Sequence, residues 1–199
     1  MIKAFVLGSL NIDHFLSVDH IVQESETTQV LESIEFLGGK GANQAVAMAM
    51  NTNTVFVANV GVNDEDRLIK ELEKYSITPR LSIDKLSGLA IVQVDKKGEN
   101  AILLIPNANK TWDFLNIYSK LKDITDGDYI VLQNEVSLHV VKQVLEALKD
   151  LDLTIVLNPA PFTADILDII EYVDILVLNR IEAEQLVSSI GQTASSPRE

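Results

Sequence analysis

The stretch Phe36–Ala49, FLGGKGANQAVAMA, carries the residues of this chain best suited to hold a ligand. Glycines surround Lys40, and Asn43 follows where the chain enters an apolar helical segment, which we expect to begin near Ala42. Glycine lets a backbone approach a ligand closely, and the free N–H groups at a helix start attract anions and hydroxyl oxygens. Gly39, Lys40 and Asn43 are therefore candidate contacts for a polyhydroxylated or anionic molecule. A purely structural tight turn is the alternative.

Two familiar phosphate-binding loops do not match this stretch. A Walker A loop requires Ser or Thr directly after Gly-Lys, whereas Gly41 follows Lys40 here. A dinucleotide-binding fingerprint places its glycines directly after the first strand, and here about thirty residues intervene.

Carboxylates and carboxamides follow three of the apolar runs. Asn11 and Asp13 lie in GSLNIDH, Glu135 ends LQNE, and Asn179 and Glu182 lie in NRIEAEQL. A carboxylate can accept strong, directional hydrogen bonds from paired hydroxyls. Each has a structural alternative: Asn11 and Asp13 can shape a turn, Glu135 can cap the helix that follows it, and the last pair has capping-box spacing.

The composition excludes several functions. The chain has 199 residues, 47% of them apolar, and a net charge of −13, which disfavours contact with the phosphate backbone of a nucleic acid. No cysteine is present, so disulfides and thiolate metal sites are impossible, and the three histidines are too scattered to predict a zinc site. The sequence also has no secretory signal or membrane-spanning run. We therefore expect a cytoplasmic protein with no nucleic-acid or membrane partner.

Buried strands alternate with amphipathic helices along most of the chain. Runs rich in Val, Ile and Leu predict strands at Ile2–Leu7, Thr54–Ala58, Asp128–Leu132, Leu153–Leu157 and Asp174–Leu178. Apolar residues at helical spacing predict helices at Glu65–Tyr75, Val136–Leu148, Thr163–Val173 and Ile181–Ile190. This order predicts an α/β fold, a doubly wound, mostly parallel sheet flanked by helices.

Two regions interrupt this alternation. Phe15–Glu35 and Leu89–Ile105 contain β-rich runs without a helical pattern, and the second reads as a hairpin around KKGEN. We expect a small separate sheet with strands within residues 14–36 and 88–106. It could serve as a lid over a ligand site or simply extend the edge of the main sheet.

The ordered set of motifs resembles the ribokinase branch of the PfkB sugar-kinase family. GSLNIDH is followed by GGKGANQAVA, then by GENAILLIPNAN, LQNE, NPAP and NRIEAEQL, in the order that the family shows. The resemblance covers nearly the whole chain. It implies an ATP-dependent kinase that phosphorylates a sugar hydroxyl, with D-ribose as the expected sugar.

The resemblance also implies roles for single residues. Asn11 and Asp13 match sugar-binding positions, as do the loop residues Gly39, Lys40 and Asn43, and the strand-end acid Glu135. Asn179 and Glu182 match the N-x-x-E pair that lies near Mg²⁺ and the nucleotide phosphates. Partners implied by the resemblance are a small sugar, ATP and Mg²⁺, with a monovalent cation in some relatives and a homodimer formed through the lid.

One expected motif has no match. The catalytic base of the family is an aspartate in a Gly-Ala-Gly-Asp-type segment, and no such segment occurs here, so no catalytic residue is assigned. The segments that bind adenine are also unmatched. We therefore expect residues 1–199 to form one α/β domain that is incomplete at its C-terminus, inactive alone and able to bind nucleotide only if the remaining part is supplied. Alternatives are a non-catalytic sugar-binding or interaction module, or another PfkB kinase acting on a sugar or nucleoside.

Overall fold

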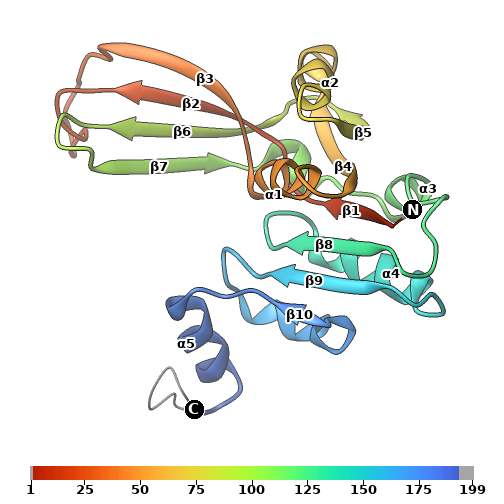
Figure 1. Ribbon diagram of the computed structural model, residues 1–199. Coiled ribbons are helices and arrows are strands. Elements are labelled where there is room, and N and C mark those ends of the chain that lie inside the picture. The colour runs from red at the N-terminus through yellow and green to blue at the C-terminus, as the bar shows by residue number, and fades with distance from the viewer. Residues whose placement is uncertain (1, 193–199) are drawn as a thin grey trace.

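The computed structural model describes residues 2–192 and contains two sheets (Figure 1). The main sheet is parallel throughout and has the strand order β10-β9-β8-β1-β4-β5. Its strands are β1 (Lys3–Leu7), β4 (Asn53–Gly61), β5 (Ile77–Asp84), β8 (Tyr129–Gln133), β9 (Thr154–Asn158) and β10 (Ile175–Leu176). The central strands have near-continuous apolar sequences because helices cover both faces of the sheet.

Two apolar cores lie on opposite faces of the main sheet. One forms under α1 (Lys40–Ala49) and α2 (Glu65–Glu73), where Val6 and Phe56 are fully buried. The other forms under α3 (Phe114–Ser119) and α4 (Leu138–Leu148), around Phe5 and Leu132. A further helix, α5 (Arg180–Ser189), stands beyond β10 and contains no fully buried residue. Within residues 2–192, no helix is long and apolar enough to cross a lipid bilayer.

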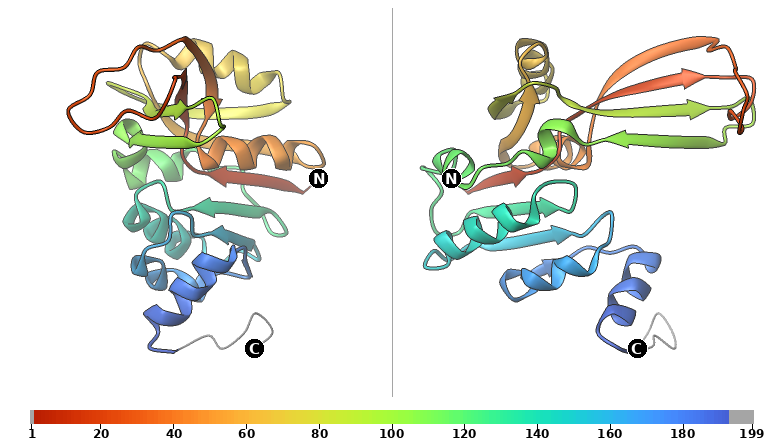
Figure 2. Two further views of the ribbon diagram at one scale, coloured as in Figure 1. Left: turned by 90° about the vertical axis from the view of Figure 1, so that its left-hand side faces the viewer. Right: turned by 180° about the vertical axis from the view of Figure 1, so that it is seen from behind.

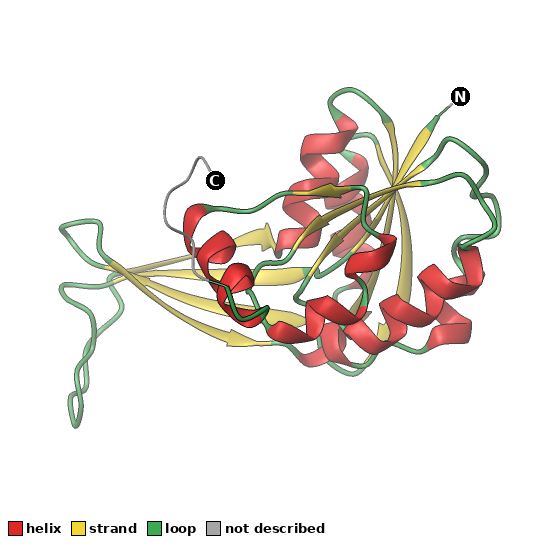
Figure 3. Ribbon diagram, turned by 90° about the horizontal axis from the view of Figure 1, so that it is seen from below, coloured by secondary structure: helices red, strands yellow, loops and turns green. Residues whose placement is uncertain are grey.

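The second sheet projects away from the main body (Figures 2 and 3). It has the order β3-β2-β6-β7 and consists of β2 (Asn11–Ser17), β3 (Glu32–Gly38), β6 (Gly88–Val94) and β7 (Asn100–Ile105). Strand β2 runs antiparallel to β3 and parallel to β6, and β7 runs antiparallel to β6. A mostly parallel sheet flanked by helices, with a small second sheet, confirms the predicted fold class.

The segment between β9 and β10 departs from the predicted helix over residues 163–173. It forms two short 3-10 helices, Ala164–Asp168 and Ile170–Tyr172. Ile166 and Ile169 are fully buried and three residues apart, and a three-residue turn places both on one side. The predicted strand at 174–178 is correspondingly reduced to two paired residues, Ile175 and Leu176.

The start of α1 and the presence of β5 also differ from the sequence-based prediction, each for a local reason. Helix α1 begins at Lys40, two residues before the predicted start, and its N-cap Gly39 has φ = +93°, a conformation that glycine adopts readily. Strand β5 was not predicted. Its sequence ITPRLSID mixes polar residues with Pro79, a composition that an edge strand tolerates.

Candidate functional site

The glycine loop packs directly against the end of β1. A Cβ atom on Gly41 would lie 2.5 Å from the backbone nitrogen of Ser9 and 2.6 Å from the carbonyl carbon of Gly8. The N–H of Ala42 donates to the carbonyl oxygen of Ser9 over 3.0 Å. The start of α1 and the turn after β1 therefore touch backbone to backbone, which is possible only without side chains at this crossing.

Glu135 connects the end of β8 to this crossing. Its Oε2 atom accepts hydrogen bonds from the hydroxyl of Ser9 (2.5 Å) and from the backbone N–H of Lys40 (3.0 Å). The carboxylate thus caps α1, whereas the helix that follows it in sequence, α4, has Ser137 at its N-cap. Within residues 2–192, its second oxygen, Oε1, has no hydrogen-bond partner and remains free to accept one.

Asp13 lies on β2, above Gly38 of the paired strand β3. A Cβ atom on Gly38 would meet the carboxylate of Asp13 at 2.1 Å, so glycine at this position creates the space that the carboxylate occupies. The Oδ1 atom of Asp13 is buried and has no partner among the described residues. Burial raises the pKa of Asp13, the negative charge of Glu135 raises it further, and His14 acts in the opposite direction. A buried acceptor without a donor is rare, and it marks a place where a ligand hydroxyl can bind.

Asn11 is fixed by a residue that the sequence did not single out. Its Oδ1 atom accepts from Nδ2 of Asn109 over 2.7 Å, and Oδ1 of Asn109 accepts from the backbone N–H of Leu10 over 3.0 Å. Gly88 on β6 leaves room for this pair, because a Cβ atom there would lie 2.2 Å from both side chains. Asn109 and Ser9 both lie inside the quoted motifs, so their positions were visible in the sequence, but their buried contacts span about a hundred residues or more.

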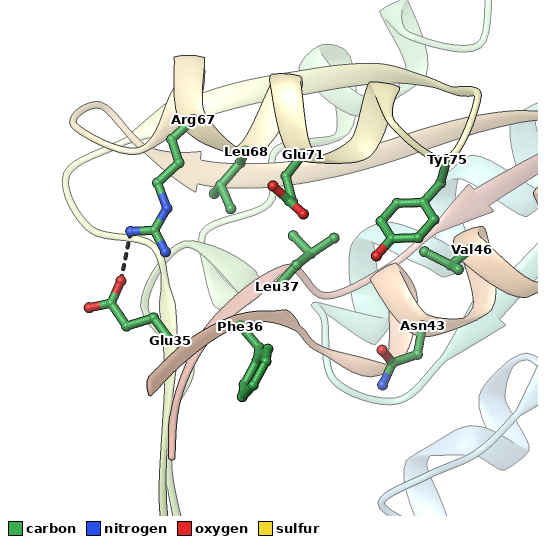
Figure 4. Close-up of a pocket in the computed structure, with 9 residues that line it drawn as sticks. All are labelled: Glu35, Phe36, Leu37, Asn43, Val46, Arg67, Leu68, Glu71 and Tyr75. Atoms are coloured by element: carbon green, nitrogen blue, oxygen red, sulfur yellow. Dashed lines mark ion pairs between the residues drawn. The ribbon is translucent and has the colours of Figure 1, made fainter. Parts of the chain in front are cut away.

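Lys40 and Asn43 lie on the first turn of α1. The Lys40 side chain is half-buried, and its ammonium group makes no hydrogen bond or ion pair within the described part of the chain. Asn43 is exposed, and its amide points to the same side as Phe36, the residue paired with Asp13 (Figure 4). Asn43 also borders a pocket of about 320 Å³ between β3, α1 and α2.

Asn179 and Glu182 form a complete capping box at the start of α5. Oδ1 of Asn179 accepts from the N–H of Glu182, and Oε2 of Glu182 accepts from the N–H of Asn179, both over 2.9 Å. Across residues 2–192, no hydrogen bond or ion pair joins this pair to Asp13, Glu135 or Lys40. The same range contains no group of three or more His, Cys, Asp or Glu residues that could hold a metal ion.

The groups that do come together therefore suit a neutral polyhydroxylated ligand. Asp13 and Glu135 offer carboxylate oxygens, Asn11 offers an amide, and Lys40 offers an unpaired positive charge at a helix N-terminus. Asn43 shares no hydrogen bond or ion pair with these four residues within residues 2–192, and its part in the site stays a prediction. Hydroxyl groups can donate to the two acids and accept from the others, as sugar recognition requires.

The sequence and the fold of this chain are similar to those of known proteins. The model of the pfkB family carbohydrate kinases matches residues 1–196. The ribokinase of Staphylococcus aureus is 34% identical over 190 residues, which is 92% of this chain and 62% of that protein. Among solved structures, ribokinase from Thermotoga maritima has a TM-score of 0.82 at 33% identity, covering 96% of this chain and 64% of that one. Ribokinase from Cryptococcus neoformans in complex with ADP has a TM-score of 0.83 at 28% identity, covering 100% and 63%.

The length of these relatives exceeds that of this chain. The chain spans about three fifths of the curated ribokinases that it matches over most of its own length. The matched part contains both sheets and the residue cluster around Asp13 and Glu135.

Proposed function

Because this chain belongs to the PfkB family of carbohydrate kinases, we propose that it carries the sugar-binding part of an ATP-dependent kinase that phosphorylates D-ribose to ribose 5-phosphate. The observation that carries the proposal is the buried Oδ1 atom of Asp13, which has no partner within residues 2–192. The names of the similar proteins support ribose as the sugar.

The sugar is held by groups from both sheets. Its hydroxyls donate to Asp13 and to the free Oε1 of Glu135, and Asn11 and Asn43 supply amide contacts. Gly39 lets the backbone approach the ring, while Lys40 places positive charge where a phosphoryl group would arrive. Fixing the hydroxyl in this way contributes to catalysis by orientation.

Phosphate transfer needs parts beyond these residues. Transfer of the γ-phosphoryl group requires charge neutralisation, in-line positioning and a base for the attacking hydroxyl. No Gly-Ala-Gly-Asp segment occurs among the 199 residues. We therefore expect this chain alone to bind the sugar without transferring phosphate.

ATP and Mg²⁺ are the cosubstrate and ion of the proposed reaction. Asn179 and Glu182 are proposed to lie near the nucleotide phosphates, and their capping box orders the start of α5 for that role. Because the described residues offer no cluster of three metal ligands, Mg²⁺ would be bound chiefly by phosphate oxygens and water, with Glu182 reaching it through water.

A calorimetric titration tests the proposed function. We expect the 199-residue chain to bind D-ribose, to bind ATP weakly or not at all, and to show no ATP-dependent phosphorylation of ribose in a coupled assay. Adenosine and D-fructose serve as control ligands, and tighter binding of either would favour another kinase of the family.

Sugar binding without nucleotide binding fits both the proposed partial kinase and a non-catalytic sugar-binding module. Adding the unmatched C-terminal part of a ribokinase separates them, because only the former gains activity. Absence of binding to any of these sugars would contradict both.

We also propose that two copies associate through the second sheet. Phe15, Ile34 and Phe36 lie on one face of this sheet, are 36–50% exposed and border a groove of about 240 Å³. Ile102 and Leu104 on β7 extend the same apolar face, which is unusual for a surface that meets only water.

Light scattering is expected to give the mass of a dimer, and Ile34→Glu is expected to give a monomer that still binds ribose. If the unmodified chain is a monomer at micromolar concentration, the proposed dimer is wrong.

A further inference from the structure

The second sheet is attached to the main body at one end only. The chain passes between the two parts at residues 8–10, Gly39, residues 85–87 and Pro106, and all four connections are short. The remainder of the sheet extends away from the body in every view (Figures 1 and 2). A sheet held in this way can tilt about its attached end.

One ion pair supports the sheet beyond this attachment. Nη1 of Arg67 on α2 lies 2.7 Å from Oε2 of Glu35 on β3 (Figure 4). Among residues 2–192, this is the only ion pair between the second sheet and the main body. The other oxygen of Glu35, Oε1, lies 3.0 Å from Nε2 of His14 on the neighbouring strand β2. The hydrogen bond from Arg67 lowers the pKa of Glu35 from its ordinary value.

Arg67 contacts the second sheet on the face opposite to the one that carries Asp13. Glu35 and Leu37 point toward α2, whereas Phe36 points the other way. Phe36 is the register partner of Asp13, and directly paired residues share a face, so the Asp13 carboxylate lies on the far side from Arg67. A sheet that tilts toward a ligand on the Asp13 side must therefore lengthen the contact between Glu35 and Arg67.

The space behind this contact is not filled by side chains. The pocket of about 320 Å³ lies between β3, α1 and α2, and both Glu35 and Arg67 border it. Leu37, next to the attached end of β3, packs against the core under α2. Farther out along β3 the pocket separates the strand from α2, and the ion pair between Glu35 and Arg67 spans that gap.

We propose that Arg67 is a positioning residue whose ion pair with Glu35 holds the second sheet against α2 and opposes its tilt toward a bound sugar. The part of this inference that concerns the sugar rests on the proposed function. A partly exposed ion pair is worth up to about 1 kcal/mol, which corresponds to about a fivefold change in an equilibrium. Arg67→Ala is therefore expected to tighten ribose binding by about two- to fivefold.

Distance measurements test the inference without any sugar. Because the chain has no cysteine, Lys97→Cys at the turn between β6 and β7 and Lys149→Cys at the end of α4 provide two specific spin-label sites. In this background, Arg67→Ala is expected to shift and broaden the distance distribution. Lys74→Ala is the matched control, because it removes one charge and one ion pair from the same helix without touching the second sheet. The charge-swapped double variant Glu35→Arg/Arg67→Glu is expected to restore the original distribution.

The outcomes separate this inference from the proposed function. If Arg67→Ala and the parent give superimposable distributions, the positioning role of Arg67 is wrong, whether or not ribose binds. If the distribution shifts but no sugar binds, the role in holding the sheet stands and the proposed function fails. If ribose binds the parent and Arg67→Ala with equal affinity, the sheet does not tilt against this ion pair on binding, and the inference is overturned.

Discussion

Asp13→Asn is expected to weaken ribose binding by about 10- to 100-fold and, at the same time, to stabilise the folded chain at pH 7. A hydrogen bond to a charged group contributes about 1.5–3 kcal/mol, and asparagine of the same shape offers an uncharged oxygen in place of the carboxylate. The loss of affinity follows from the unpaired Oδ1 atom, which is the acceptor that the sugar would complete.

The gain in stability follows from the direction of the pKa shift. Burial raises the pKa of Asp13, with a further contribution from Glu135, so the folded chain holds this proton at a higher pH than the unfolded chain does. The contribution of Asp13 to stability is therefore greatest below its unfolded pKa of about 4 and falls as the pH rises through the folded value. Asparagine does not titrate, so the variant is expected to exceed the parent in melting temperature at pH 7 and to lose that advantage toward pH 4.

Calorimetry with ribose and thermal unfolding at several pH values measure both effects. Glu32→Gln is a suitable control, because it removes one charge from the same sheet at an exposed position that has no partner within the described residues. We expect it to change neither affinity nor the pH profile. A variant of Asp13 that binds ribose as well as the parent would remove the main support for the proposed function.

Gly41→Ala is expected to lower the free energy of unfolding by about 3 kcal/mol or more, although the substitution lies inside a helix. In a helix interior, alanine is normally about 1 kcal/mol more favourable than glycine. Here the new methyl group would lie 2.5–2.7 Å from backbone atoms of Gly8 and Ser9, which cannot rotate away as a side chain would. The strand end and the helix start must separate, and overpacking of this kind is strongly destabilising.

Urea denaturation followed by circular dichroism measures this effect. Gly98→Ala is the control, since no atom lies within 4 Å of its Cβ position and only its positive φ of +81° is strained, at about 1 kcal/mol. Gly41→Ala should also impair sugar binding, because Ser9, Glu135 and Lys40 meet at this crossing. If it unfolds at the same urea concentration as the parent, the backbone contact described between β1 and α1 is not rigid.

The buried strands could be predicted because each one is apolar along its length, whichever strands lie beside it. Helices on both faces make β1, β4, β8 and β9 continuous apolar runs, which stand out in the sequence. Strand β5 at the edge has no such run, so it was missed. The helix predicted over residues 163–173 failed for a different reason: buried residues spaced by three suit a 3-10 turn as well as an α-helical one.

The candidate site was only partly visible in the sequence. Motifs indicated Asp13, Lys40 and Glu135, but each of them had a local explanation that sequence alone could not reject. The structure shows that Glu135 caps α1, a helix that begins 95 residues earlier. Asn109 was missed because its contacts with Leu10 and Asn11 span almost a hundred residues, and no local pattern records such a contact.

The central position of β1 has a consequence for the newly made protein. This strand pairs with β4 on one side and with β8 on the other, and Ser9 beyond its end meets Glu135, which is 126 residues away. Before the ribosome has translated β8, the edge of β1 that faces β8 presents unpaired backbone groups. The nascent chain must therefore be kept from aggregating until β8 emerges, and slowing translation just before that point should lengthen its exposure to chaperones.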